Sequence, residues 1–322
     1  MGFRLCIGLV LAPLALIRAS GEPASRPLSP TLELDVQDAK RNRTIPILVY
    51  FPPADAPRPA PVVLFSHGLG GSRHGYVYLG QHWSSRGYVC VFLQHPGSDD
   101  RVWKDSERTA ILGSLRNAAS LQNYLLRAQD VPAVLDQLEI WGKQKGHALE
   151  GRLNLEQVGM AGHSFGAITT QCAMGQESPM GGARFRESRI DAAIVLSPSP
   201  PQVGSPERAF GNVRIPVLAM TGTLDNDPVR SSIQPQDRRK VYAALPPGNK
   251  YELVFDGGRH SAFSDRSLGL DPPRHERIHP AIQAITTAFW DAYLKGNEDA
   301  KKWLRSDAAR KLLATSDIWE WQ

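Results

Sequence analysis

The segment Gln157-Val-Gly-Met-Ala-Gly-His-Ser-Phe-Gly-Ala-Ile-Thr-Thr-Gln-Cys-Ala-Met174 is the most informative stretch of this 322-residue chain. Its first six residues have the apolar character of a buried strand, and the residues from Ala167 onward have that of a helix. Between them, Gly162-His-Ser-Phe-Gly166 matches a sharp strand-to-helix turn that exposes the Ser164 hydroxyl at a helix N-terminus. Glycines are needed on both flanks because so sharp a turn crowds any side chain. We therefore predict that Ser164 is a nucleophile.

Apolar runs of strand length alternate with stretches of helix length on both sides of this segment. The predicted strands are residues 31–36, 44–51, 61–67, 88–95, 157–162, 190–196, 215–220 and 251–255, and further predicted helices are 76–86, 106–142 with a break near Pro132, 237–245 and 280–295. The first two strands alternate apolar and polar residues, whereas the later ones are continuous apolar runs typical of strands buried on both faces. This order predicts an α/β fold with a mostly parallel, doubly wound sheet and an antiparallel N-terminal edge.

A serine nucleophile needs a base to take its proton, and His260 is the predicted base. It directly follows the last predicted strand, in Gly258-Arg-His-Ser-Ala-Phe263, where a glycine-rich loop can turn it toward Ser164. Five of the other histidines fit less well, because they flank substrate loops, end a strand or precede the final helix: His67, His95, His163, His275 and His279.

The histidine in turn needs a carboxylate that fixes its tautomer, and two aspartates compete for this role. Both lie in Thr221-Gly-Thr-Leu-Asp-Asn-Asp-Pro228, directly after a predicted strand. Asp225 is favoured because it lies three residues beyond Gly222. Asp227 remains the alternative acid, although it precedes a proline that restricts its backbone and favours a turn role.

Two backbone amides are predicted to hold the oxyanion of a tetrahedral intermediate. One is the amide of Phe165, the residue after the nucleophile. The other comes from the loop Ser66-His-Gly-Leu-Gly-Gly71, whose glycines allow a substrate to approach the backbone, and Leu69 is the predicted donor.

Composition and charge exclude several other functions. The chain is 42% apolar, so it can form a sizeable core, and its formal charge of +5 comes from basic residues that are mostly scattered among acids. No basic arm indicates nucleic-acid binding. No cluster of histidine, cysteine and carboxylate residues has metal-ligand spacing, so no metal site is expected, and no phosphate-binding loop is visible.

The N-terminal residues 1–21 read as a secretory signal peptide, with Arg4 before a short apolar run and small residues after it. The run is too short for a membrane span, and removing Arg4 and Arg18 from the charge of +5 leaves +3. A linker over 22–30 and a single domain over 31–322 with a C-terminal helical tail are expected to follow. The predicted location is secreted or periplasmic, without stable membrane insertion; a retained N-terminal anchor is the alternative.

The cysteines do not form a disulfide framework. Cys6 lies in the predicted signal peptide, while Cys90 lies in a strand-like run and Cys172 in a helix-like one. Small buried thiols are the simplest interpretation of the last two, although export would permit a bridge between them.

Four segments together resemble the predicted dienelactone-hydrolase branch of the α/β-hydrolases, which is similar to the platelet-activating-factor acetylhydrolase and cutinase-like polyester-hydrolase groups. They are Ser66-His-Gly-Leu-Gly-Gly-Ser-Arg-His-Gly-Tyr76, Leu93-Gln-His-Pro-Gly-Ser98, Gly162-His-Ser-Phe-Gly166 and Gly258-Arg-His-Ser-Ala-Phe263. The resemblance covers most of residues 31–305, and the order Ser164, Asp225, His260 is the one expected of these enzymes. It implies an α/β-hydrolase fold of about eight strands, no cofactor, and hydrolysis of short or medium carboxylic esters.

One departure narrows the expected chemistry. Dienelactone hydrolases proper use a cysteine nucleophile, whereas this chain has Ser164, so a serine esterase acting on small-molecule esters is the expectation. Tyr76, Trp83 and Trp103 could line an open groove of the polyester-hydrolase kind, but aromatic residues at such spacings more often belong to a core. An acyltransferase or amidase on the same residues, or a non-catalytic binding module, are the alternatives.

Overall fold

Nine strands form one sheet in the computed structural model, which describes residues 28–104, 107, 109–229, 233–265 and 277–322. The predicted signal peptide, most of the linker, and His275 lie outside the described residues. The strands are β1 (Thr31–Asp38), β2 (Arg43–Tyr50), β3 (Ala60–Ser66), β4 (Val89–Leu93), β5 (Leu153–His163), β6 (Ile190–Leu196), β7 (Val217–Leu224), β8 (Lys250–Arg259) and β9 (Ile318–Trp321).

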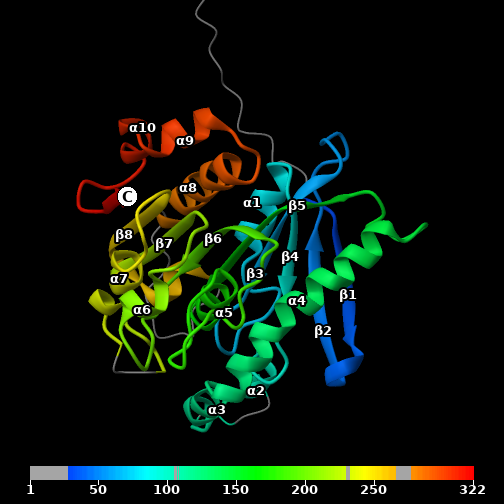
Figure 1. Ribbon diagram of the computed structural model, residues 1–322, viewed down its shortest axis with the longest axis horizontal. Helices are drawn as coiled ribbons and strands as arrows, with labels where there is room; N and C mark the ends of the chain where they lie inside the picture. Colours follow the sequence, from blue (N-terminus) through cyan, green and yellow to red (C-terminus); the bar gives the residue numbers. More distant parts are fainter. Residues whose placement is uncertain (1–27, 105–106, 108, 230–232, 266–276) are drawn as a thin grey trace, which may run out of the picture.

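The sheet order is β1-β2-β4-β3-β5-β6-β7-β8-β9 (Figure 1). From β4 to β8 neighbouring strands pair in parallel, while β1 with β2, β2 with β4, and β8 with β9 pair antiparallel. The predicted α/β fold, with its mostly parallel sheet and antiparallel N-terminal edge, is confirmed. Its carboxyl ends place the residues that follow β3, β5, β7 and β8 at one edge of the sheet.

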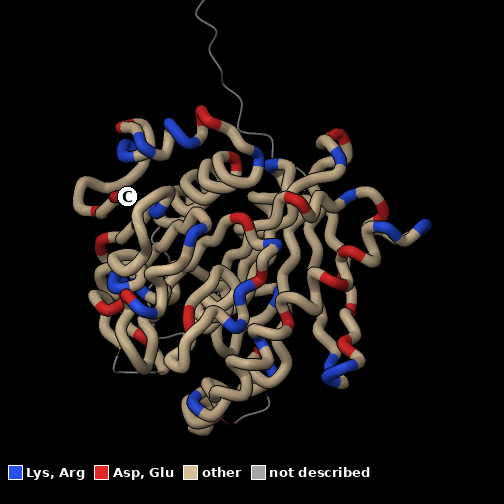
Figure 2. The backbone as a smooth tube through the Cα atoms, in the orientation of Figure 1, with Lys and Arg blue, Asp and Glu red and all other residues tan. Residues whose placement is uncertain are grey.

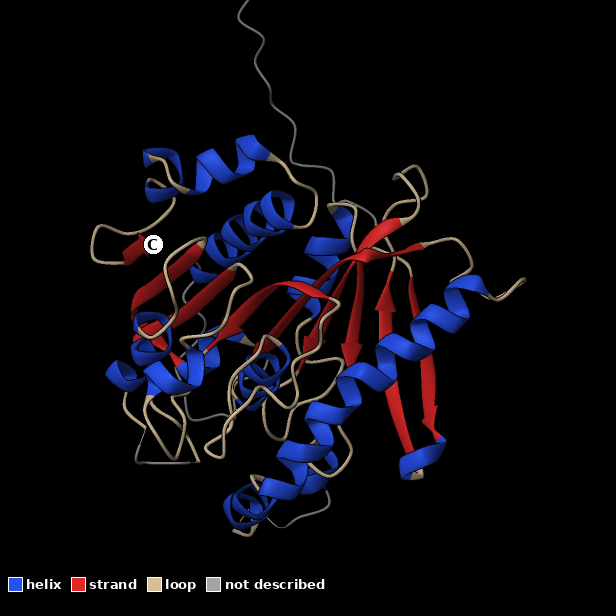
Figure 3. Ribbon diagram, viewed as in Figure 1, coloured by secondary structure: helices blue, strands red, loops and turns tan. Residues whose placement is uncertain are grey.

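Helices cover both faces of the sheet (Figure 3). On one face lie α1 (Val77–Ser85), α8 (Ile278–Tyr293), α9 (Glu298–Leu304) and α10 (Asp307–Arg310), and on the other lie α4 (Leu121–Lys143), α5 (Phe165–Ala173), α6 (Pro206–Phe210) and α7 (Pro235–Ala243). The short helices α2 (Arg101–Lys104), α3 (Ile111–Ala118), η1 (Ala39–Arg41) and η2 (His260–Phe263) complete the set among the described residues. Strand β3 is apolar throughout because alternate residues enter opposite cores: Val63 and Phe65 pack toward α1 and α8, and Val62 and Leu64 toward α4.

The predicted helix break near Pro132 is wrong. Helix α4 continues through Pro132, and the described part of the predicted helical region is interrupted instead before Ser120, whose side chain accepts a hydrogen bond from the Asn123 amide and caps α4. Proline lacks the N–H that would bond the carbonyl four residues earlier, which weakens the helix locally. Burial of Val131, Val134, Leu135 and Leu138 against the sheet holds the two halves together.

The C-terminal tail is not wholly helical, and the sheet has one strand more than the resemblance implied. After α9 and α10 the chain ends in β9, which pairs antiparallel with β8 in the register Tyr251↔Trp321 to Val254↔Ile318. The Trp319 ring stacks on Tyr251, and its N–H donates to the Leu304 carbonyl. These contacts fasten the tail to the edge of the sheet.

Candidate active site

Ser164 occupies the turn between β5 and α5, with a backbone φ of 57° and ψ of −116°. This conformation is strained for a residue other than glycine. A Cβ on Gly162 would overlap the Gly166 carbonyl, and a Cβ on Gly166 would overlap the carbonyls of Ser66 and His67. The two glycines are therefore required by close backbone approach. The Ser164 side chain makes no capping bond to α5, whose N-terminal partial charge favours a developing anion.

Ser164, His260 and Asp225 come together although they lie far apart in sequence. The Ser164 Oγ lies 2.8 Å from His260 Nε2, and His260 Nδ1 lies 2.7 Å from Asp225 Oδ1. A carboxylate can only accept, so Nδ1 carries the ring proton and Nε2 is left to accept the serine proton. His260 begins η2 directly after β8, and Asp225 directly follows β7. This arrangement allows nucleophilic catalysis by serine.

Asp225 and Asp227, left as alternatives by the sequence, occupy different places. Asp225 is fully buried and contacts His260, whereas Asp227 lines the cavity and accepts a hydrogen bond from the Val229 amide at 2.9 Å. The latter contact is typical of an aspartate in a turn. Asp225 is therefore the acid within reach of the histidine.

Two residues that the sequence did not single out hold Asp225. The Thr221 hydroxyl donates to Asp225 Oδ2 at 2.8 Å, and the buried Arg238 places its Nε 3.0 Å from Asp225 Oδ1. Burial alone would raise the pKa of Asp225, but the charges of His260 and Arg238 lower it to about 2. The carboxylate is therefore ionised at neutral pH.

The predicted oxyanion donors lie beside the nucleophile on adjacent strands. Strands β3 and β5 pair Ser66 with Gly162, so the turn after β3 that carries Leu69 borders the turn that carries Phe165. Both residues line the cavity with Ser164. Among the described residues, neither amide donates to another protein group. Both N–H groups are therefore available to a ligand.

The neutral His163 connects the base His260 with residues 66–71, the segment that carries Leu69 and is called the donor loop from here on. His163 Nε2 lies 3.1 Å from the carbonyl of His260 and therefore donates to it, while His163 Nδ1 accepts from the Tyr76 hydroxyl at 2.9 Å. That hydroxyl in turn accepts from the Gly68 amide at 3.1 Å. Burial first, and then the nearby charge of His260, lowers the pKa of His163 well below its usual value, which keeps it neutral.

A cavity of about 810 Å³ opens over these residues. Its wall includes Trp103 of α2, Pro179 of the segment between α5 and β6, and Pro201 of the segment between β6 and α6. Of the aromatic residues considered from sequence, Tyr76 and Trp103 line the cavity, whereas Trp83 is fully buried in the core and donates to Thr286. Trp103 donates its N–H to the Gly70 carbonyl at 2.7 Å and so braces the donor loop.

Thr221 and Arg238 were not assigned to the site from sequence, and the contacts that join Tyr76 and His163 to the base were not predicted either. Arg238 belongs to the run Arg238-Arg239-Lys240, which resembles a solvated helix face, and only the packing of α7 on β7 buries it. Thr221 shares a segment with Asp225, so its place four residues before the candidate acid is the one signal that could have revealed it.

Cys90 and Cys172 are both buried and unbridged. Within the residues that the structure describes, no group of three or more histidine, cysteine or acidic residues is arranged to hold a metal ion, and no helix is long and apolar enough to cross a membrane. Lysine and arginine are interspersed with aspartate and glutamate along the chain trace (Figure 2).

Comparison with known proteins agrees with this fold. A family model described as platelet-activating factor acetylhydrolase, isoform II, matches residues 50–102, the part that contains β3, β4 and the donor loop. A solved structure, the ferulic acid esterase from Streptomyces cinnamoneus, is 22% identical with a TM-score of 0.54, over 86% of this chain and 93% of that one. No curated protein matches the chain. The predicted resemblance to the α/β-hydrolases is thus confirmed at the level of fold, and the matched segment resembles the acetylhydrolase group.

Proposed function

We propose that this protein is a serine hydrolase that cleaves carboxylic esters through an acyl-enzyme on Ser164. One observation carries the proposal: Ser164 Oγ, His260 and Asp225 are linked at 2.8 Å and 2.7 Å at the wall of a cavity. The family whose model matches residues 50–102 and the similar solved structure are both named for ester hydrolysis, which supports this chemistry.

In the proposed first step, His260 Nε2 takes the Ser164 proton while Oγ attacks the ester carbonyl carbon. The carbonyl oxygen becomes an anion that accepts hydrogen bonds from the Leu69 and Phe165 amides. Asp225 stabilises the imidazolium. His260 then gives its proton to the leaving alkoxide, so an alcohol departs and the acyl group stays on Ser164.

In the second half, a water molecule replaces the alcohol. His260 takes one proton from water, the resulting hydroxide attacks the acyl carbon, and the same proton returns to Ser164 as the carboxylic acid leaves. The side chains that line the cavity include Leu115, Ile168 and Val203, which favour a substrate with an apolar acyl or alcohol part. Small-molecule esters with short or medium acyl groups are the proposed substrates.

Covalent labelling tests the proposal. A fluorophosphonate should modify Ser164 in the folded protein, and Ser164→Ala should abolish labelling and reduce kcat for a p-nitrophenyl ester by about 10⁴-fold to 10⁶-fold. Ser178→Ala is the matched control, because Ser178 also lines the cavity but its hydroxyl donates to the Gly181 carbonyl. Labelling of another residue, or full activity in Ser164→Ala, would contradict the proposal.

A further inference from the structure

Arg127 of α4 is a buried charge that forms no ion pair with any residue that the structure describes. It is 1% exposed, and none of the ion pairs among the described residues includes it. The two aspartates whose charges act on Arg127 form their ion pairs elsewhere: Asp130 with Arg41, Arg43 and His95, and Asp99 with Arg101. An unpaired buried charge lowers stability unless hydrogen bonds offset the lost hydration.

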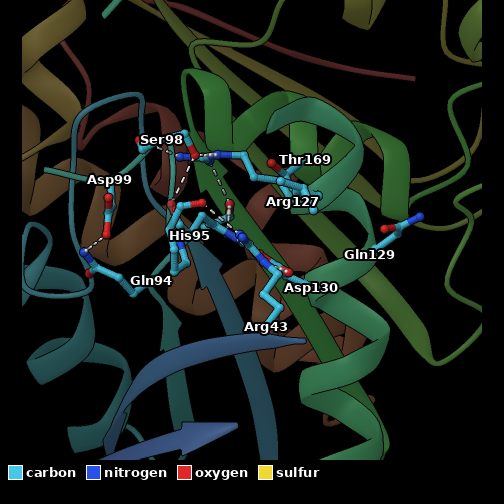
Figure 4. A network of polar contacts seen from close by, with 12 residues as sticks. Arg43, Gln94, His95, Ser98, Asp99, Arg127, Gln129, Asp130 and Thr169 are labelled. Atoms are coloured by element: carbon cyan, nitrogen blue, oxygen red, sulfur yellow. Dashed lines mark hydrogen bonds and ion pairs between the residues drawn. The ribbon is translucent and has the colours of Figure 1, made fainter. Parts of the chain in front are cut away.

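All of the hydrogen bonds that the Arg127 side chain donates among the described residues go to groups in or beside the donor loop. Its Nη1 donates to the His67 carbonyl at 2.7 Å, and its Nε donates to the Ser98 hydroxyl at 2.7 Å, as Figure 4 shows for Ser98. The guanidinium also lies 4.5 Å from the centre of the Phe165 ring. Arg127 thus touches both segments that carry a proposed oxyanion donor.

His67 extends this support to the donor peptide itself. The His95 amide donates to His67 Nε2 at 3.1 Å, so Nε2 is an acceptor and the ring proton lies on Nδ1. Nδ1 then donates to the Gly68 carbonyl at 2.7 Å. Burial first, and then the charge of Arg127, lowers the pKa of His67 well below its usual value, so the ring is neutral.

The Gly68 carbonyl accepts from three directions: His67 Nδ1 at 2.7 Å, the Gly71 amide at 3.0 Å and Arg127 Nη2 at 3.5 Å. This carbonyl and the Leu69 N–H belong to one planar peptide group and point in opposite directions. Holding the carbonyl therefore also holds the N–H. Rotation of this peptide would break all three contacts and remove the Leu69 donor from the site.

We propose that Arg127 is a positioning residue that, together with His67, fixes the Gly68–Leu69 peptide in the orientation in which the Leu69 N–H can receive the oxyanion. The inference rests on the proposed function and adds to it. Preset donors act in the transition state rather than on the bound ester, so the loss of Arg127 should reduce kcat more than it changes KM.

The test compares wild type with Arg127→Met, which removes the fork of donors while filling similar space. We expect kcat for a p-nitrophenyl ester to fall by about 10-fold to 100-fold, with KM changed by less than about threefold. A trifluoromethyl ketone, which forms an oxyanion on Ser164, should bind more weakly by the same factor as kcat/KM. The matching secondary alcohol, which forms no oxyanion, should bind equally well to both proteins.

Arg41→Met is the matched control, because Arg41 contacts Asp130 in the same polar network but does not contact the donor loop. Its kcat should stay within about threefold of wild type. Thermal unfolding of each variant checks that the fold is intact. If Arg127→Met does not fold, Arg127→Lys replaces it: lysine keeps the charge but cannot make the forked contacts, so kcat should still fall by about tenfold.

Three results would overturn the inference: unchanged kcat in a folded Arg127→Met, full activity in Arg127→Lys, or equal weakening of the ketone and the alcohol. Failure of the proposed function gives a different result. In that case wild type itself neither hydrolyses the ester nor binds the ketone more tightly than the alcohol, and the inference fails with it.

Discussion

Replacing Asp225 with asparagine should reduce kcat/KM by about 10³-fold. His260 Nδ1 donates to Asp225 Oδ1 at 2.7 Å, and the positively charged Arg238 Nε lies 3.0 Å from the same oxygen while it donates to the Asp225 backbone carbonyl, so the introduced asparagine should keep its amide oxygen there. Its NH₂ group then faces the Thr221 hydroxyl, which can accept. The histidine tautomer is thus preserved. The fall in kcat/KM then comes from the loss of the negative charge that stabilises the imidazolium.

The size of the loss follows from the missing charge. At an effective dielectric constant of about 20, opposite charges about 4 Å apart attract by about 4 kcal/mol. At about 1.4 kcal/mol for each factor of ten in rate, this corresponds to about 10³-fold. Arg238 adds a second effect, because its Nη2 lies 3.2 Å from His260 Nδ1 and repels the imidazolium once the carboxylate is gone.

Steady-state hydrolysis of a p-nitrophenyl ester at pH 7 measures these effects, with Asp227→Asn as the control that should change kcat/KM by less than about threefold. The double variant Asp225→Asn/Arg238→Met should lose less activity than the product of the two single losses, because it also removes the unpaired cation. A larger loss in Asp227→Asn than in Asp225→Asn would refute the reasoning, and strictly multiplicative losses would refute the role given to Arg238.

Two further predictions concern stability. Burial raises the pKa of Glu252 from 4.5 to about 7 despite its bond to Arg239, so the folded state binds a proton more tightly than the unfolded state. Unfolding free energy should therefore fall by up to about 3 kcal/mol as pH rises from about 4.5 through about 7; urea unfolding should show this slope in wild type but a flatter one in Glu252→Gln. Gly166→Ala should destabilise the fold by more than about 3 kcal/mol, because a Cβ there meets the Ser66 and His67 carbonyls. Gly113→Ala should instead stabilise the fold by up to about 1 kcal/mol, because Gly113 lies in α3 with open space around its Cα. Equal melting temperatures for these two glycine variants would contradict the second prediction.

The fold was predictable because its signals are local. Each buried strand of the parallel region is a short apolar run, and the alternation of these runs with helical stretches indicates the crossovers. Strand β9 was missed because Ile318-Trp-Glu-Trp321 is too short to be recognised without its partner β8. The helix break predicted near Pro132 was wrong because the packing of α4 on the sheet outweighs the local helix-breaking preference of proline.

The candidate site was predictable where the chemistry restricts residue type and order, as for Ser164 and His260. The site was not predictable where the position of a side chain depends on contacts between segments that are distant in sequence. Choosing between Asp225 and Asp227 requires the path of the loop after β7, and the burial of Arg127 and Arg238 depends on how α4 and α7 pack on the sheet. Neither arginine differs in local sequence from a residue on a solvated helix face.

The pairing of Ser66 with Gly162 has a consequence for how the substrate range of such a protein can change. Neighbouring strands in any sheet lie about 4.8 Å apart, so the spacing between the two donor segments is inherited from the hydrogen-bonded ladder rather than from the loops. The loops that contribute Pro179 and Pro201 to the cavity wall are not part of that ladder, whereas Trp103 of α2 donates to the Gly70 carbonyl and so holds the donor loop. Exchanging these two loops should therefore alter which esters enter the cavity without changing the spacing between the segments that carry the Leu69 and Phe165 amides. The two loops are the natural targets for engineering.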